Sequence, residues 1–209
     1  MQLLSPTLSL TRYRVEGNLP DPVMDSVREG LKNHVIREID NDPAVKSVGW
    51  TIPGTPFNPD FAGNHFVFGT SFVFSLRIDK KSLPSKIVNK HYHAAVQKRL
   101  AGTSREHLSR DEKREIKDDV LHRLYVRIPA TPSIYDLVWQ PEAGDLWFFS
   151  NLKEANEDLE TLFSKSFQLS LVRIFPYTAA YFFSGLEGER LDALHKASPA
   201  VFNAGRAHD

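Results

Sequence analysis

The chain of 209 residues contains no cysteine. This absence excludes disulfide bonds, thiol catalysis and cysteine-bound zinc, and it is typical of proteins kept in a reducing cytoplasm. Long apolar runs are lacking too, so we expect no segment to span a membrane. The first ten residues have neither a basic stretch nor a long apolar stretch, and we therefore expect no secretory signal.

Common catalytic motifs are also missing. The sequence has no H-E-x-x-H pair, no G-x-S-x-G elbow, no Walker loop and no G-x-G-x-x-G. One metal-nuclease pattern is present, because Pro59-Asp60 followed by Asp79-Lys80-Lys81 fits PD…DxK. In that pattern two carboxylates hold Mg²⁺ and the lysine positions the attacking water. The pattern is short and common, so we assign no catalytic residue, no metal ligand and no cofactor.

Charge is balanced over the whole chain but unevenly distributed along it. The chain carries 26 Lys and Arg against 26 Asp and Glu. Between Arg77 and Arg127, however, 14 basic residues stand against 7 acidic residues, an excess of seven positive charges that the rest of the chain offsets. Such a segment is typical of surfaces that neutralise nucleic-acid phosphates. The alternative is a solvated helical pair whose basic side chains simply face water.

The residues on either side of this basic segment predict an α+β body. Strands are indicated near residues 8–15, 45–52, 66–76, 134–140, 145–150 and 169–175, with amphipathic helices near 22–35 and 152–167. This order predicts two related β-α-β-β-type halves with antiparallel sheets, and an inserted helical hairpin. Alternating Phe66, Phe68, Phe72 and Phe74 are expected in the core, and a base-stacking platform is the alternative.

The basic segment itself is expected to form two helices. Pro84 precedes the first, from about Ser85 to Leu100, and Asp111 is the expected N-cap of the second, which ends near Ile128. The spacing predicts that Ile116, Val120, Leu124 and Ile128 form its buried apolar seam. We therefore expect a body of residues 1–82 and 129–183, a basic helical hairpin arm of residues 83–128, and a C-terminal helical tail of residues 184–209.

The arm supplies the candidate binding residues. Eight cations are expected to contact DNA, namely Lys86, Lys90, Lys98, Arg99, Arg110, Lys113, Arg114 and Lys117. A projecting hairpin buries little of itself, so apolar residues near the end of its second helix are candidates for self-association. These are Leu124, Tyr125 and Ile128, for which the alternative is packing on the first helix or the body.

Several segments resemble the RdgC family of bacterial recombination-associated proteins. The most specific is the run from Asp111 to Leu124 (DEKREIKDDVLHRL), which is similar to the family's DEVLH-like helix and follows a similar Leu83-Pro84-Ser85. Three weaker matches occur in the family's order: Val48 to Pro53, the hairpin from Trp139 to Trp147, and the helix from Ala155 that leads to Pro176. The resemblance covers about Leu8 to Phe183.

This resemblance implies an α+β fold and a non-catalytic, sequence-independent DNA-binding protein of the cytoplasm and nucleoid. It also implies ring-shaped dimers that enclose duplex DNA and restrain a RecA-type recombinase, with the helical arm making one of two dimer contacts. Family members are usually about half as long again, so we expect a short member that lacks the usual C-terminal part. Some members are labelled exonucleases. A metal-dependent exonuclease and a protein-interaction module that uses the arm are therefore the alternatives.

Overall fold

The computed structural model describes residues 8–102 and 105–198, in which seven strands and six helices form an α+β fold. The strands are β1 (Thr11–Glu16), β2 (Lys46–Thr51), β3 (Val67–Phe68), β4 (Ser71–Lys80), β5 (Thr131–Gln140), β6 (Asp145–Phe148) and β7 (Ser170–Arg173). The helices are α1 (Val23–Asn33), α2 (Ser85–Ala101), α3 (Arg110–Arg127), α4 (Lys153–Phe167), α5 (Pro176–Ser184) and α6 (Glu189–Lys196). The predicted fold class is thus confirmed.

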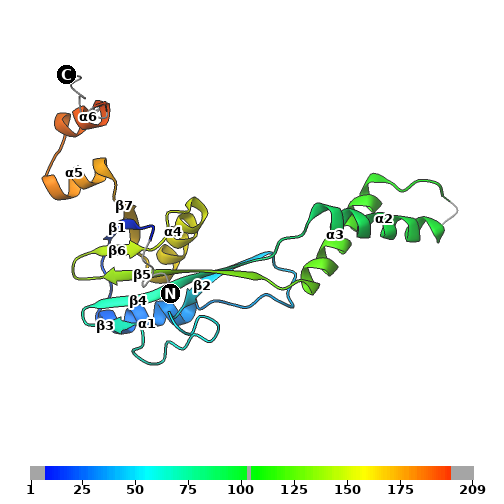
Figure 1. Cartoon of the computed structure of the whole chain (residues 1–209), viewed down its shortest axis with the longest axis horizontal. Helices are drawn as coiled ribbons and strands as arrows, with labels where there is room; N and C mark the ends of the chain where they lie inside the picture. Colours follow the sequence, from blue (N-terminus) through cyan, green and yellow to red (C-terminus); the bar gives the residue numbers. More distant parts are fainter. Residues whose placement is uncertain (1–7, 103–104, 199–209) are drawn as a thin grey trace, which may run out of the picture.

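All seven strands belong to one antiparallel sheet (Figure 1). Its order is β2-β4-β5-β6-β1-β7, and the short β3 pairs with β4. Strand β1 comes from the first expected half, yet it pairs with β6 and β7 of the second. The two groups of strands expected from the sequence therefore share a single continuous sheet.

The main core lies between this sheet and the helices α1 and α4. Its largest fully buried side chains include Trp50, Trp139 and Phe163. The two helices approach each other closely at Gly30, where a Cβ atom would lie 2.6 Å from the carbonyl oxygen of Ser166. A larger residue would force the helices apart, so glycine at this position sets their spacing.

The alternating phenylalanines of the sequence divide between core and surface. Phe66, Phe72 and Phe74 are buried, as expected for a core face. Phe68 is 62% exposed, because the chain turns at Gly69 between β3 and β4 instead of continuing as one strand. No row of four aromatic rings is therefore presented on one face.

The arm projects from one end of the sheet (Figure 1). Strands β4 and β5 pair from Phe72 and Trp139 as far as Lys80 and Thr131, and α2 and α3 follow beyond that point. The arm helices enclose a small core of their own, separate from the main one, formed by Val88, Leu108, Ile116, Val120 and Leu124. This separation supports the proposed division into body and arm.

The start of α3 differs from the sequence expectation. The N-cap is Ser109, two residues before the expected Asp111. The Ser109 hydroxyl accepts a hydrogen bond from the Glu112 backbone N–H at 3.2 Å, and the Glu112 carboxylate accepts one from the Ser109 N–H at 2.8 Å. This reciprocal capping box satisfies two backbone donors at once, which a cap at Asp111 would not do.

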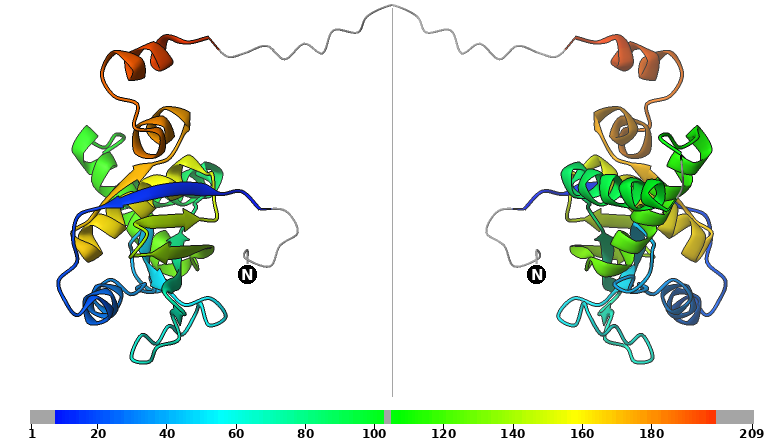
Figure 2. Two further views of the ribbon diagram at one scale, coloured as in Figure 1. Left: turned by 90° about the vertical axis from the view of Figure 1, so that its left-hand side faces the viewer. Right: turned by 90° about the vertical axis from the view of Figure 1, so that its right-hand side faces the viewer.

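Helices α5 and α6 lie beyond β7, far from the arm (Figures 1 and 2). Neither helix contains a buried residue. Residues 199–209 of the expected tail lie outside the described residues. Within residues 8–102 and 105–198, no helix combines the length and the apolar character needed to cross a membrane.

Candidate nucleic-acid interface

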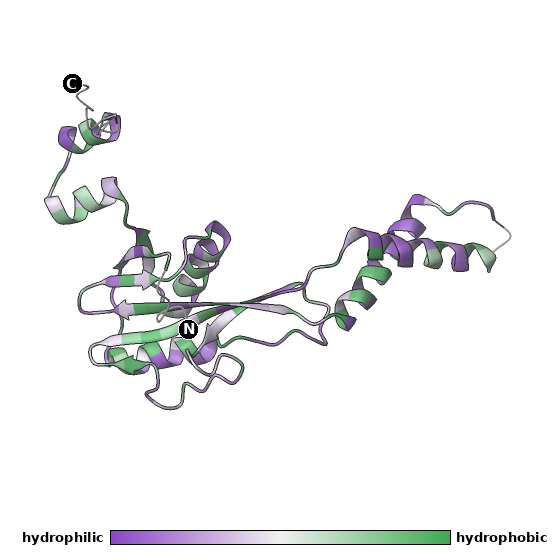
Figure 3. Ribbon diagram, viewed as in Figure 1, coloured by the Kyte–Doolittle hydropathy of each residue, from purple (hydrophilic) through white to green (hydrophobic). Residues whose placement is uncertain are grey.

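All eight cations predicted from the sequence are exposed on the two arm helices. Positions 88, 92 and 95 of α2 and positions 116, 120 and 124 of α3 face the small arm core. Most of the other residues of both helices are hydrophilic, as the colours of the arm ribbon in Figure 3 show. The apolar seam thus directs the basic residues outward.

Four of these cations gather along α3. Arg110, Lys113, Arg114 and Lys117 line a shallow groove of about 620 Å³ together with Tyr92 and Asp111. We call this the α3 groove. Spacings of three and four residues place the four cations on one side of the helix. None of them forms an ion pair with another described residue, so their charges are available to an anionic partner.

A second groove runs between the arm helices, and we call it the interhelical groove. Its volume is about 650 Å³, and Lys98, Arg99, Arg123 and Arg127 contribute its cationic side chains. Arg99 also pairs with Glu115 at 3.4 Å. Sequence reasoning counted Arg123 and Arg127 in the basic excess but did not select them as site residues. Their four-residue spacing was the available signal, because it places both on one side of α3.

Lys86 and Lys90 lie on neither groove. Each is two residues from the buried Val88, which places it about 160° around the helix from that position. They therefore occupy the outer face of α2. The structure divides the eight predicted cations among three surfaces and does not bring them together in one patch.

The base of the arm is held by a buried lysine. Lys81 is 2% exposed, and its Nζ donates to the carbonyl oxygens of Asp40, Asp42 and Tyr125 at 3.1, 2.8 and 2.6 Å. These hydrogen bonds tie the end of α3 to the connection between α1 and β2. Lys81 belongs to the basic excess seen in the sequence, but its charge is not offered to a partner.

The three candidates for self-association lie close to this joint. Leu124 is 9% exposed and packs in the arm core, which corresponds to the alternative considered for it. Tyr125 and Ile128 are half-buried at the end of α3. A second copy of the chain could therefore reach the latter two side chains more readily than Leu124.

The residues of the PD…DxK pattern are engaged in other contacts. Asp79 is buried and forms a two-pronged ion pair with Arg77 at 2.7 and 2.6 Å. Lys80 pairs with Glu154 at 2.9 Å, and the Asp60 carboxylate accepts the Ala62 N–H at 2.8 Å. Across the described part of the chain, no three His, Asp or Glu side chains gather as a metal-binding group. The residues of the pattern thus serve in a buried ion pair, a surface ion pair and a loop hydrogen bond.

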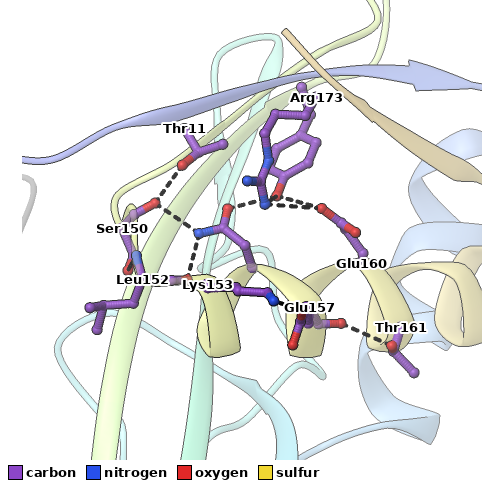
Figure 4. Close-up of polar contacts among 10 residues, drawn as sticks. Thr11, Ser150, Leu152, Lys153, Glu157, Glu160, Thr161 and Arg173 are labelled. Carbon is purple, nitrogen blue, oxygen red and sulfur yellow. Dashed lines mark hydrogen bonds and ion pairs between the residues drawn. The ribbon is translucent and has the colours of Figure 1, made fainter. Parts of the chain in front are cut away.

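A second polar centre lies in the body between β1, β7 and α4 (Figure 4). The Tyr13 hydroxyl is 2.6 Å from Asn156 Oδ1 and 2.9 Å from Glu160 Oε1, and the Arg173 guanidinium donates to both Tyr13 and Glu160. Burial is the main cause that raises the pKa of Tyr13 above its ordinary value. The groups satisfy one another, so this centre fastens α4 to the sheet edge.

A comparison with known families agrees with the resemblance seen in the sequence. The model of the family described as "Putative exonuclease, RdgC" matches residues 9–180. The match includes the whole sheet, the arm and α4, and it ends within α5. No curated protein matches the sequence. The extent of the family match is close to the range expected from the short motifs.

Proposed function

The chain belongs to the RdgC family, and on that premise we propose that it is a recombination-associated protein that binds DNA independently of sequence through its arm. The observation that carries this proposal is the α3 groove, where four exposed cations lie side by side without ion-pair partners among the described residues. Phosphate contacts of this kind position a protein on DNA but carry no sequence information.

The dimensions of the α3 groove suit a DNA strand. Residues 110 to 117 extend about 10 Å along the helix axis, which equals the axial rise of about three phosphates on one strand of B-DNA. Cations at this spacing match phosphates that repeat regularly along a DNA strand. Because a duplex holds its phosphates at regular spacing, this match favours duplex DNA as the partner. The interhelical groove and the outer face of α2 offer further cations to a DNA molecule that curves around the arm.

Further parts of the proposal concern assembly and cellular role. We propose that the protein forms a homodimer through the base of its arm, where Tyr125 and Ile128 remain partly exposed. We also propose that it acts at the nucleoid and restrains a RecA-type recombinase, as its resemblance to the family implies. If the arm serves assembly alone, it is a protein-interaction module and its cations are solvated.

The family description names an exonuclease, and this is the second candidate function. We favour binding without cleavage, because Asp79 is paired with Arg77 and Asp60 is used within its own loop. Both oxygens of Asp79 and one oxygen of Asp60 are thus already used in hydrogen bonds within the protein.

Fluorescence anisotropy with two duplexes of unrelated sequence tests the proposal. We expect equal affinities that fall steeply as salt is raised. The same duplexes, end-labelled and incubated with Mg²⁺ or Mn²⁺, should remain intact. A strong preference for one sequence, or an affinity that salt does not change, contradicts the proposed binding mode. Metal-dependent shortening of the label favours the exonuclease.

A further inference from the structure

Among the described residues, Tyr92 is the one aromatic residue that lines the α3 groove and the one lining residue that comes from α2. The other lining residues lie between Arg110 and Lys117 and belong to α3. Tyr92 follows the buried Val88 by four residues, so it lies on the side of α2 that packs against the arm core. It therefore stands where the arm core meets the cations of the groove.

The two ends of the Tyr92 side chain have different surroundings. Its ring packs against the arm core and lies edge-on to the His93 ring, with 5.7 Å between the ring centres. Its hydroxyl forms no hydrogen bond with a residue in 8–102 or 105–198, and it is not one of the buried polar atoms that lack a partner. This half-buried residue therefore keeps its hydroxyl open to solvent, as tyrosines with a packed ring and a polar tip commonly do.

An open hydroxyl in a groove with four cations is suited to a phosphate. Tyrosine hydroxyls donate to DNA phosphates alongside lysine and arginine, and a hydrogen bond to a charged acceptor is stronger than one between neutral groups. The Tyr92 ring is already held by the arm core, so it loses less side-chain freedom on binding than a long cationic side chain does. The same packing makes the ring less available for stacking on a base.

We propose that the Tyr92 hydroxyl donates a hydrogen bond to a backbone phosphate of DNA in the α3 groove, and so positions the strand against both arm helices. This inference rests on the proposed DNA binding and adds to it a contact that carries no charge. A neutral donor displaces no counterion, so its loss should weaken binding without changing the slope of log affinity against log salt. Loss of a groove cation should instead flatten that slope.

Tyr92→Phe removes the hydroxyl and keeps the packed ring, so the arm should keep its fold, which circular dichroism checks. Fluorescence anisotropy titrations with one duplex at several salt concentrations give the affinity and the salt slope. We expect the variant to bind about tenfold more weakly at every salt concentration, near the lower limit for a hydrogen bond to a charged group. Its slope should equal that of the unmodified chain.

Tyr181→Phe is the matched control. It removes a hydroxyl from an exposed tyrosine of α5, which lies far from the arm (Figure 1), and it should bind as the unmodified chain does. Tyr92→Phe that binds as tightly as the unmodified chain overturns the inference. So does a flatter salt slope in Tyr92→Phe, because the loss would then lie in the cations, and so does an equal loss of affinity in Tyr181→Phe.

The unmodified chain tests the proposed function separately from this inference. If it does not bind the duplex with an affinity that falls as salt is raised, the proposed DNA binding fails and the role of Tyr92 fails with it. If it binds in this way and Tyr92→Phe binds equally well, the role of Tyr92 alone is refuted.

Discussion

Neutralising two cations of the α3 groove tests the proposed DNA contact directly. The double change Lys113→Gln and Lys117→Gln removes two charges that stand one helical turn apart on the same side of α3. Both side chains are exposed and neither is in an ion pair with a described residue. Glutamine and lysine have similar helix propensities, so the arm should keep its fold. Any loss of affinity then reports lost phosphate contacts.

The expected size of the effect follows from the number of contacts. If each of the four groove cations contacts one phosphate, the slope of log affinity against log salt is about −3.6, and affinity falls about 150-fold between 50 and 200 mM salt. With two contacts left, the slope is about −1.8 and the fall over the same interval is only about 12-fold. The variant should therefore bind more weakly at low salt and be less sensitive to added salt.

A matched control separates local contacts from overall charge. Lys153→Gln with Lys165→Gln removes the same two charges from exposed positions on α4, in the body. Anisotropy titrations at several salt concentrations give a slope for each protein. The control should keep the slope of the unmodified chain. Equal slopes for all three proteins, or a larger change in the α4 control, would refute the assignment of the α3 groove to DNA.

Two further predictions concern assembly and stability. Tyr125→Asp places a charge at the base of the arm and should shift a dimer towards monomer in sedimentation, with the helical circular dichroism signal retained; an unmodified chain that stays monomeric at high concentration contradicts the dimer. The folded state raises the Tyr13 pKa, so this group contributes stability that is fully present below its ordinary pKa of 10.0 and is lost as pH rises above it. Tyr13→Phe should lower the free energy of unfolding by about 1–3 kcal/mol at neutral pH, because the partners of the hydroxyl lose a hydrogen bond. The variant should also lose less stability than the unmodified chain as the pH is raised above 10.0. Urea titrations that show the same alkaline loss of stability in both proteins contradict this role.

Local patterns in the sequence predicted helix α3 well. The apolar spacing identified Ile116, Val120, Leu124 and Ile128. The first three are buried in the arm core, whereas Ile128 is only half-buried, because α3 ends one residue before it. The helix start was placed two residues late because aspartate and serine are both good caps. The spacing of Ser109 and Glu112 was the better signal, since it allows the reciprocal capping box.

Other features depend on contacts that no local pattern carries. Strand β1 pairs with strands more than a hundred residues away, so its place in the sheet is decided by packing of the whole body. In the sequence, Lys81 and Asp79 resemble parts of a charged surface turn, yet both are buried. The partners of Lys81 come from other segments of the chain, and the partner of Asp79 is Arg77 on the same strand. Asp79 and Lys81 therefore match the DxK part of a nuclease pattern although both residues serve in structural contacts.

The site was predictable only in part for a similar reason. Exposure of the eight cations followed from the apolar seam, but their division among three surfaces depends on how α2 and α3 pack. Arg123 and Arg127 face the interhelical groove only because α2 lies against that side of α3. A list of basic residues therefore indicates the arm, and the packing of the arm decides which cations act together.

The arm is an insertion between two neighbouring, directly paired residues of the sheet. Lys80 and Thr131 are directly paired neighbours, so a two-residue turn could close β4 and β5 where residues 81–130 now stand. Replacing such a turn with a loop of that length raises the entropy cost of closure by about 3 kcal/mol, which the arm core and the Lys81 hydrogen bonds help to offset. We therefore expect that an arm of another length or charge, joined at this residue pair, leaves the register of the sheet unchanged and gives the same body a different binding surface.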